Sequence, residues 1–299
     1  MIPSPIADSF KSQFIESISA DFIIKKYKRE LDLDTERFFE GISKVEVRKC
    51  VETGYRFYYP PNILADGAFY QELNEGRSYY HSWNWEQKLA AKYIKDGDKV
   101  LDLGCGEGAF LAHLKKIREV EELGLDISES AVKAAQDQKL HAVCKRPEEL
   151  TESHHQQFDV ITAFQVLEHI YDIKSFIETC NALLKPGGIL IISVPNNAPY
   201  YDTFDQYHTL NLPPHHMGLW DSRSLKAIAS VYEMTQILEK TQEVDSFKRK
   251  LKMKYSISNK RGTLFFIKLL PAFLIKLYFQ FKHHDYKGAG ILSVYKAAG

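Results

Sequence analysis

The chain has 299 residues, with 39 basic and 39 acidic side chains and no formal net charge at pH 7. Hydrophobic residues make up 44% and charged residues 26% of the sequence, which is typical of a globular protein and excludes a disordered, collagen-like or coiled-coil chain. Zero net charge argues against binding of nucleic acid through bulk electrostatics. The four cysteines lie far apart and form no Cys-x-x-Cys pair, so we expect neither a zinc knuckle nor a redox dithiol.

The N-terminal part is expected to combine helix and hairpin. Phe10, Phe14 and Ile18 recur at helical spacing, so we predict a helix over residues 1–40. Residues 44–59 alternate between apolar and polar, like two strands joined by a turn. A stretch rich in aromatic residues follows. Its members are Tyr79, Tyr80, Trp83 and Trp85.

Short apolar runs alternate with helical segments in the rest of the chain. Strands that alternate with helices are joined by right-handed crossovers, so the pattern predicts a parallel sheet. The predicted strands are residues 100–103, 122–127, 141–144, 158–164, 189–194, 235–243 and 290–295. The predicted helices cover residues 85–94, 109–116, 130–138, a segment after residue 172, and 224–232.

The most informative stretch is residues 100–108, which read Val-Leu-Asp-Leu-Gly-Cys-Gly-Glu-Gly. A buried strand here runs into a glycine turn, where a ligand can approach the backbone closely ahead of a helix N-terminus. Asp126 ends the next strand, where a carboxylate can accept hydrogen bonds from both ribose hydroxyls of an adenosine ligand. Asp102 precedes the glycines. An acid there suits a cofactor with a cationic amino-acid end, and it does not suit a pyrophosphate.

This stretch resembles motif I of the class I S-adenosylmethionine-dependent methyltransferases. Four more of that family's landmarks follow in the same order, at residues 125–128, 158–161, 166–170 and 184–188. The resemblance implies an α/β, Rossmann-like fold with a seven-stranded sheet, an antiparallel last strand and helices on both faces. It also implies a methyltransferase that uses S-adenosylmethionine.

The resemblance assigns the cofactor site residue by residue. The residues implied to line the methionine and ribose end are Asp102, Gly104, Cys105 and Gly106. Asp126 is implied to bind the ribose hydroxyls, and Ile127 to cover the adenine. The residues implied to border the methionine moiety at the end of the fourth strand are Ala163, Phe164 and Gln165.

Glu168 and three histidines form a constellation that suits acid–base or metal chemistry. His169, His215 and His216 follow sheet strands, on the edge toward which the transferred methyl group must point, so we predict that one of them is the general base for an acceptor hydroxyl. These residue types also ligate divalent metals, and the set resembles the Glu-x-x-Glu-His and later histidines of small-RNA 3′-end methyltransferases. Gln165 replaces the first Glu of that pattern, so we expect no metal. The alternative is a structural or substrate-binding role.

The acceptor is predicted from residues 211–225, which resemble a stretch of bacterial methyltransferases encoded with polysaccharide and glycolipid enzymes. We expect a rigid loop over the active site, then a helix capped by Ser222 or Ser224. The favoured reaction is O-methylation of a sugar, glycan or glycolipid acceptor. The alternatives are a quinone or other small aromatic molecule, RNA, and a cofactor-binding scaffold without catalysis. Three tyrosines before the loop could stack on a sugar or ring: Tyr200, Tyr201 and Tyr207.

We expect an N-terminal extension over residues 1–84 and a methyltransferase domain over residues 85–299, with a basic and then apolar insertion at 244–287. In relatives of this family the aromatic stretch folds over the cofactor, so the resemblance implies a lid. Packing between two parts of the chain is the alternative. Within the insertion, two lysines and a proline interrupt the apolar run of residues 264–281, so we expect no transmembrane helix. A peripheral contact with an anionic membrane, packing on the sheet and a homodimer face are the alternatives. The N-terminal residues show no basic region followed by an apolar run, as a secretory signal would, so we expect a cytoplasmic protein.

Overall fold

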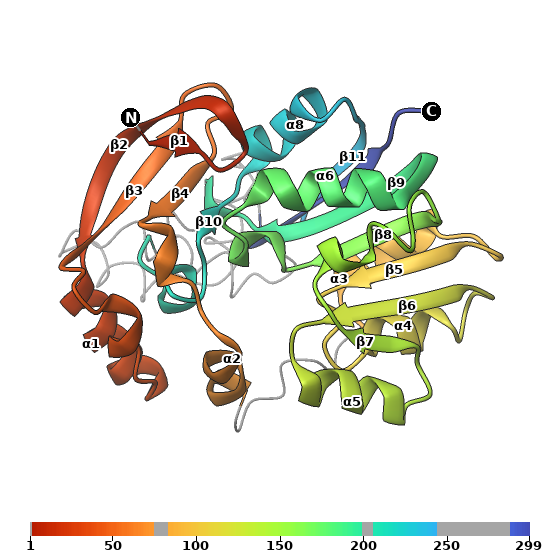
Figure 1. Cartoon of the computed structure of the whole chain (residues 1–299), viewed down its shortest axis with the longest axis horizontal. Coiled ribbons are helices and arrows are strands. Elements are labelled where there is room, and N and C mark those ends of the chain that lie inside the picture. Colours follow the sequence, from red (N-terminus) through yellow and green to blue (C-terminus); the bar gives the residue numbers. More distant parts are fainter. Residues whose placement is uncertain (1, 75–82, 199–205, 244–287) are drawn as a thin grey trace, which may run out of the picture.

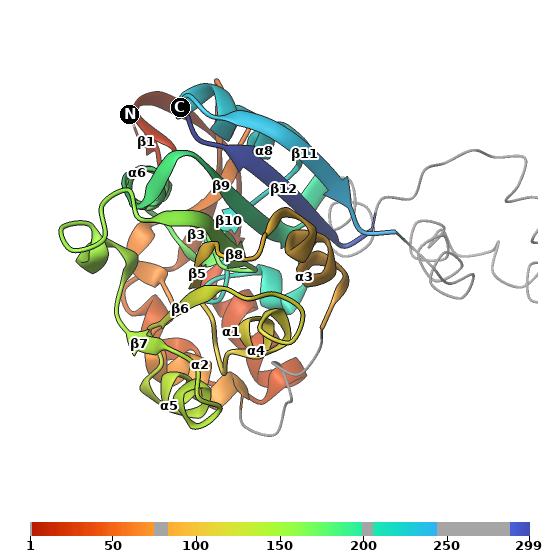
Figure 2. The same cartoon turned by 90° about the vertical axis from the view of Figure 1, so that its right-hand side faces the viewer.

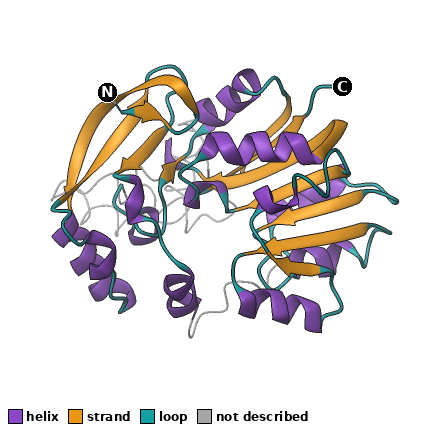
Figure 3. Cartoon of the chain, in the orientation of Figure 1, coloured by secondary structure: helices purple, strands orange, loops and turns teal. Residues whose placement is uncertain are grey.

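The computed structural model describes residues 2–74, 83–198, 206–243 and 288–299. The insertion expected at residues 244–287 lies outside the described residues, as do Tyr79, Tyr80, Tyr200 and Tyr201. The described residues form two sheets that lie side by side, each with helices packed against it (Figure 1 and Figure 3). None of the helices in these ranges combines the length and the apolar content that a membrane span requires.

The larger sheet has seven strands in the order β11-β12-β9-β8-β5-β6-β7. The pairs from β9 to β7 are parallel, whereas β12 runs antiparallel between β9 and β11. This confirms the predicted seven-stranded sheet with an antiparallel last strand. The strands are β5 (Lys99–Leu103), β6 (Glu121–Asp126), β7 (Ala142–Cys144), β8 (Phe158–Phe164), β9 (Leu184–Pro195), β11 (Thr235–Thr241) and β12 (Gly290–Lys296).

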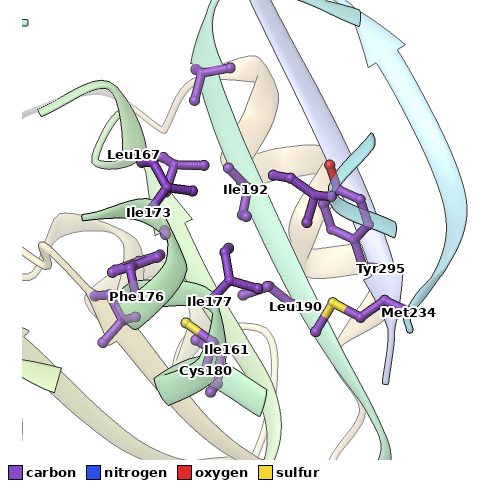
Figure 4. Close-up of a cluster of buried hydrophobic side chains, with 14 of the residues drawn as sticks. Ile161, Leu167, Ile173, Phe176, Ile177, Cys180, Leu190, Ile192, Met234 and Tyr295 are labelled. Atoms are coloured by element: carbon purple, nitrogen blue, oxygen red, sulfur yellow. The ribbon is translucent and has the colours of Figure 1, made fainter. Parts of the chain in front are cut away.

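Helices cover both faces of this sheet (Figure 2). Successive side chains of a strand point to opposite faces, so in β9 Leu190 and Ile192 join the core under α6 while Ile191 joins the core under α4. Figure 4 shows the first core, where Phe176 and Ile177 of α6 pack beside these strand residues. The helices are α3 (Trp85–Ala90), α4 (Ala109–Leu114), α5 (Glu129–Asp137), α6 (Ile173–Leu183) and α8 (Ser222–Val231).

The smaller sheet has five strands in the order β1-β2-β3-β4-β10, with each described pairing antiparallel. Four of them come from the N-terminal extension: β1 (Pro3–Ser4), β2 (Ala7–Ser19), β3 (Lys44–Cys50) and β4 (Arg56–Tyr59). The fifth strand, β10 (Gly218–Leu219), comes from the expected methyltransferase domain and pairs with Phe57 and Arg56. Helices α1 (Ala20–Leu31) and α2 (Gly67–Asn74) pack against this sheet in a third core. The boundary at residue 85 therefore stays a prediction.

The predicted helix over residues 1–40 is wrong in its first half, because residues 7–19 form the strand β2 and the helix begins at Ala20. A spacing of four residues is a multiple of the two-residue period of a strand as well as close to one helical turn. Phe14 is 54% exposed, and the pairing with β3 shifts between Phe14 and Glu16. Phe14, whose spacing supported the helix prediction, is therefore not part of a core.

Short 3-10 turns connect these elements. They cover Glu36–Phe39, Pro61–Ile63, Ala91–Tyr93, Pro147–Leu150, Leu167–His169 and Thr209–Asn211. The last two matter for the site, because each brings part of the chain to the carboxyl edge of the large sheet.

Candidate active site

The glycine turn between β5 and α4 lies at the carboxyl edge of the sheet, where open α/β folds bind ligands. Gly104 and Gly106 have φ angles of +69° and +53°, which favour glycine. A Cβ on Gly104 would lie 2.5 Å from Cγ2 of Val166, so this position has no room for a side chain. Cys105 donates its backbone N–H to the carbonyl oxygen of Leu125 at 2.9 Å, which ties the turn to β6.

Asp126 at the end of β6 is held against this turn. Its Oδ2 accepts from the backbone N–H of Gly106 at 2.9 Å, and its Oδ1 accepts from that of Ser128 at 2.8 Å. Each carboxylate oxygen has a second lone pair, so both remain able to accept a ribose hydroxyl. Ile127 follows and is 56% exposed, which places an apolar side chain in reach of an adenine ring. Cys105 is buried with its thiol toward Gly124, so it supports the turn from behind.

Asp102 lies in β5 directly before the turn and is 2% exposed. Its Oδ1 accepts a hydrogen bond of 2.6 Å from the hydroxyl of Thr162. Burial raises the pKa of Asp102 to about 7; the bond from Thr162 opposes this shift and the charge of Asp126 adds to it. A buried carboxyl group with such a pKa is poised to ionise when a cation comes beside it. The amino group of S-adenosylmethionine is such a cation.

The end of β8 contributes less than expected through its side chains. Ala163 is fully buried in the core, and the ring of Phe164 packs edge-on against Phe110 with the centroids 4.8 Å apart. Gln165 has a φ of +55°, and its Nε2 lies 3.5 Å from Oε1 of Glu86 and 3.4 Å from Oγ of Ser193. Only Gln165 of these three presents a polar side chain at the edge of the sheet.

Sequence reasoning missed Glu86, a buried acid of α3 that is 6% exposed. Burial raises its pKa to about 7, against the hydrogen bonds from Gln165 and Asn84 that lower it. Glu86 also adds to the raised pKa of Glu168, so the two carboxyl groups act on each other. A glutamate in the first turn of a helix normally faces solvent, so nothing in the sequence marked this one as buried. Glu86 and Glu168 already place two acids here, and a glutamate in place of Gln165 would add a third.

The structure brings the three predicted histidines together. The ring centroid of His169 lies 4.5 Å from that of His215 and 4.8 Å from that of His216. The rings of His215 and His216 stack with their centroids 4.6 Å apart. Burial lowers the pKa of His169 to about 4, although the carbonyls of His215 and Gln165 oppose the shift. Burial and the neighbouring His169 lower the pKa of His215 to about 3, and that of His216 falls well below its usual value. All three rings are therefore neutral at pH 7.

Residues 211–220 form the predicted loop and are buried throughout. The helix after the loop begins at Ser222, two residues before the predicted start at residue 224, and its cap is Asp221 rather than Ser222 or Ser224. Asp221 Oδ1 accepts from the backbone N–H of Ser224 at 2.8 Å, and Ser224 Oγ accepts from the backbone N–H of Asp221 at 2.9 Å. Tyr207 donates its hydroxyl to Glu16 of β2 at 3.0 Å, so this ring is tied to the N-terminal sheet.

The described tryptophans of the aromatic stretch pack on the core. Trp83 stacks on His113 with the centroids 5.2 Å apart and on Phe110 at 6.0 Å. Trp85 lies beside Gly290 of β12, where a Cβ would come within 3.3 Å of its ring. These contacts favour the packing interpretation for the two tryptophans.

The sheet order, the glycine turn and the acid at the end of β6 define the class I S-adenosylmethionine-binding fold. A family model described as methyltransferase domain matches residues 80–233, just over half of the 299 residues. The chain belongs to this family and is a class I S-adenosylmethionine-dependent methyltransferase. When bound, the cofactor supplies an electrophilic methyl group on a sulfonium, and Asp102, the glycine turn, Asp126 and Ile127 would hold it.

Curated relatives resemble less than half of the chain. The ubiquinone biosynthesis O-methyltransferase of Leptothrix cholodnii is 34% identical over 123 residues, which are 39% of this chain and 51% of that protein. The enzyme of the same name from Pseudomonas putida strain W619 is 37% identical over 150 residues, which are 43% of this chain and 64% of that protein. The chain thus spans between half and two thirds of the length of these relatives.

Two solved structures share the fold at low sequence identity. The [4+2]-cyclase SpnF has a TM-score of 0.50 and 14% identity, with 78% of this chain and 85% of that chain covered. The protein in complex with the Haloferax volcanii Trm112 methyltransferase activator has a TM-score of 0.50 and 18% identity, with 72% and 90% covered. One of these proteins is a cyclase, so the shared fold does not by itself decide the reaction.

The affinity for S-adenosylmethionine is expected to rise with pH up to about 7 and then to level off. Below that pH Asp102 holds a proton in the free protein, and binding the cationic amino group must release it. Release of one proton makes binding roughly tenfold weaker for each pH unit below 7. Titration calorimetry across this range measures the slope, and Asp102→Asn should remove it. A slope that persists in Asp102→Asn would assign the proton to another group, of which Glu86 is the first candidate.

Proposed function

We propose that the chain methylates a hydroxyl oxygen on a small ring-bearing acceptor of the quinone-precursor type. The names of the curated relatives support this alternative over the sugar or glycan acceptor that the sequence favoured. The matches cover only 39% and 43% of this chain, so the acceptor must be argued from the residues around the histidines.

The observation that carries the proposal is the aromatic surrounding of the histidine cluster, which we define as His169, His215 and His216. The ring of Tyr70 in α2 lies 5.7 Å from that of His169 and 5.9 Å from that of His215, measured between centroids. Phe69 lies 5.8 Å from His215. Aromatic rings pair favourably when they meet edge-on or at an angle, as these do, so the surroundings of the cluster suit a further aromatic ring.

The histidine cluster is where the acceptor hydroxyl would be activated. Its member His169 follows β8 on the same edge of the sheet as the glycine turn, so an acceptor held beside the cluster would face the methyl end of the cofactor. Holding two reactants in line can lower the barrier by about 7–11 kcal/mol. A ring nitrogen of the cluster that takes the hydroxyl proton as general base would add about 10²–10⁴-fold.

The test is a transfer assay with S-adenosylmethionine labelled in its methyl group. The acceptors are an alkyl-substituted dihydroxybenzene, a set of sugar nucleotides and glycolipids, and a small RNA. We expect label on the dihydroxybenzene. Label on a glycolipid or sugar nucleotide alone would restore the original expectation, and label on the RNA alone would favour that alternative. Cofactor binding without transfer to any acceptor would favour the scaffold.

A further inference from the structure

The histidine cluster gathers imidazole rings from two distant parts of the chain. His169 lies in the 3-10 turn after β8, whereas His215 and His216 lie in the buried loop before β10. One ligand nitrogen of each ring lies within 4.8 Å of those of the other two. A single general base needs one such nitrogen at the acceptor, so the convergence of three calls for a different explanation.

Hydrogen bonds set the proton position on each ring. Nδ1 of His169 lies 2.7 Å from the carbonyl oxygen of His215, and Nδ1 of His215 lies 2.8 Å from that of Leu210. Nδ1 of His216 lies 3.0 Å from Oδ1 of Asn211. Because a carbonyl oxygen can only accept, the proton sits on Nδ1 of each neutral ring and Nε2 keeps its lone pair. Histidines that ligate a metal show this arrangement almost always.

The amide of Asn211 is itself held in place. Its Nδ2 donates to Oδ1 of Asn197 at 2.6 Å, which leaves Oδ1 of Asn211 as the acceptor for His216. Both asparagines are buried. The orientation of the third ring is therefore fixed by a network that extends one residue beyond it.

Glu168 supplies a second, independent observation. Its side chain is 1% exposed, and Oε1 lies 4.0 Å from Nε2 of His169. Within the described residues, Oε2 is buried and has no hydrogen-bond partner. A buried carboxyl group without a partner is costly, and buried carboxylates in proteins are paired with a cation or bound to a metal. Both the lone pairs of the rings and this carboxyl group are thus suited to a positive ion.

We propose that His169, His215 and His216 bind one divalent transition-metal ion, with Glu168 as the adjacent carboxylate that balances its charge. Three imidazoles favour zinc, cobalt, nickel or iron over magnesium and calcium, which prefer oxygen ligands. The sequence led us to expect no metal, because Gln165 stands where the related pattern has a glutamate. The pair His215 and His216 supplies nitrogen ligands that compensate for that loss.

The consequence for catalysis rests on the proposed function, whereas the metal site does not. An ion in the cluster would lower the pKa of an acceptor hydroxyl that reaches it, and the proton would pass to water. The oxygen then forms a bond to the methyl carbon, while the carbon–sulfur bond breaks and its electron pair stays on sulfur. The product is S-adenosylhomocysteine together with the methyl ether.

The experiment titrates the untagged full chain, first stripped with a chelator, with Co²⁺ and with Zn²⁺. We expect one equivalent to bind, with visible Co²⁺ absorption bands that Zn²⁺ displaces. Asn211→Ala, which frees the His216 ring without removing a ligand, should weaken binding by about 10–100-fold. His216→Ala should weaken it further. His155→Ala, at an exposed histidine before β8, is the matched control and should leave binding unchanged.

Binding of S-adenosylmethionine shows that each variant has folded, because Asp102 and Asp126 lie outside the cluster. Absence of a Co²⁺ spectrum in a folded wild-type chain would overturn the proposal, as would a spectrum that survives in folded His216→Ala. The methyl acceptor is not used in this titration. Metal binding without any methylation would therefore overturn the proposed function and leave the metal site supported. Methylation without metal binding would overturn the metal site and leave the proposed function supported.

Discussion

Alanine in place of His169 is expected to lower kcat by about 10²–10⁴-fold, the range that a lost general acid or base costs. His169 is the ring of the cluster with the most exposed side chain, at 20%, and it adjoins both Tyr70 and Glu168. An acceptor hydroxyl can reach this ring more easily than the two rings behind it. The affinity for S-adenosylmethionine should stay unchanged, because the side chains that would hold the cofactor are those of Asp102, Asp126 and Ile127 and not that of His169. Single-turnover kinetics with saturating cofactor measures the loss.

The control is His155→Ala, which should keep the wild-type kcat. Adding a chelator to the wild type separates the two roles open to His169. A metal-free general base is insensitive to the chelator, whereas a metal ligand loses activity that Zn²⁺ or Co²⁺ restores. If kcat of His169→Ala stayed at the wild-type value, neither role would hold, and the structural interpretation of the histidines would remain.

Asp126→Ala is expected to weaken S-adenosylmethionine binding by roughly ten- to a hundredfold. Loss of hydrogen bonds to a charged acceptor costs about 1.5–3 kcal/mol, and each 1.4 kcal/mol is a factor of ten. The same substitution leaves the backbone N–H groups of Gly106 and Ser128 without their acceptor, so the glycine turn loosens as well. Titration calorimetry against the cofactor measures the change.

Two variants sharpen this test. Asp126→Asn keeps one oxygen acceptor but no charge, so its affinity should lie between the wild type and Asp126→Ala. Asp137→Ala removes an exposed acid at the end of α5 and should leave the affinity unchanged. Wild-type affinity in Asp126→Ala would mean that the ribose does not bind at the end of β6.

The part of the fold between β5 and β9 was predictable because its strands carry short apolar runs and alternate with helical segments, and because a glycine turn follows β5. The N-terminal strand β2 was not predictable, since the four-residue spacing of Phe10, Phe14 and Ile18 fits both the helical turn and the two-residue period of a strand. The meeting of His169 with His215 and His216 followed from placing both segments on one edge of the sheet. The burial of Glu86 did not follow, because it depends on a contact between α3 and Gln165 that no local pattern encodes.

Under the proposed function, the short pairing of β10 with β4 would make the N-terminal extension a component of acceptor recognition. The histidine loop runs directly into β10, so the pairing of β10 with β4 anchors the end of that loop, where Tyr58 donates its backbone N–H to the carbonyl oxygen of Met217 at 2.9 Å. The matched family region, residues 80–233, contains this loop but excludes its partner strand β4. A chimera designed to exchange acceptor specificity with another methyltransferase would therefore have to transplant residues 44–59 and 211–220 together, as one discontinuous module.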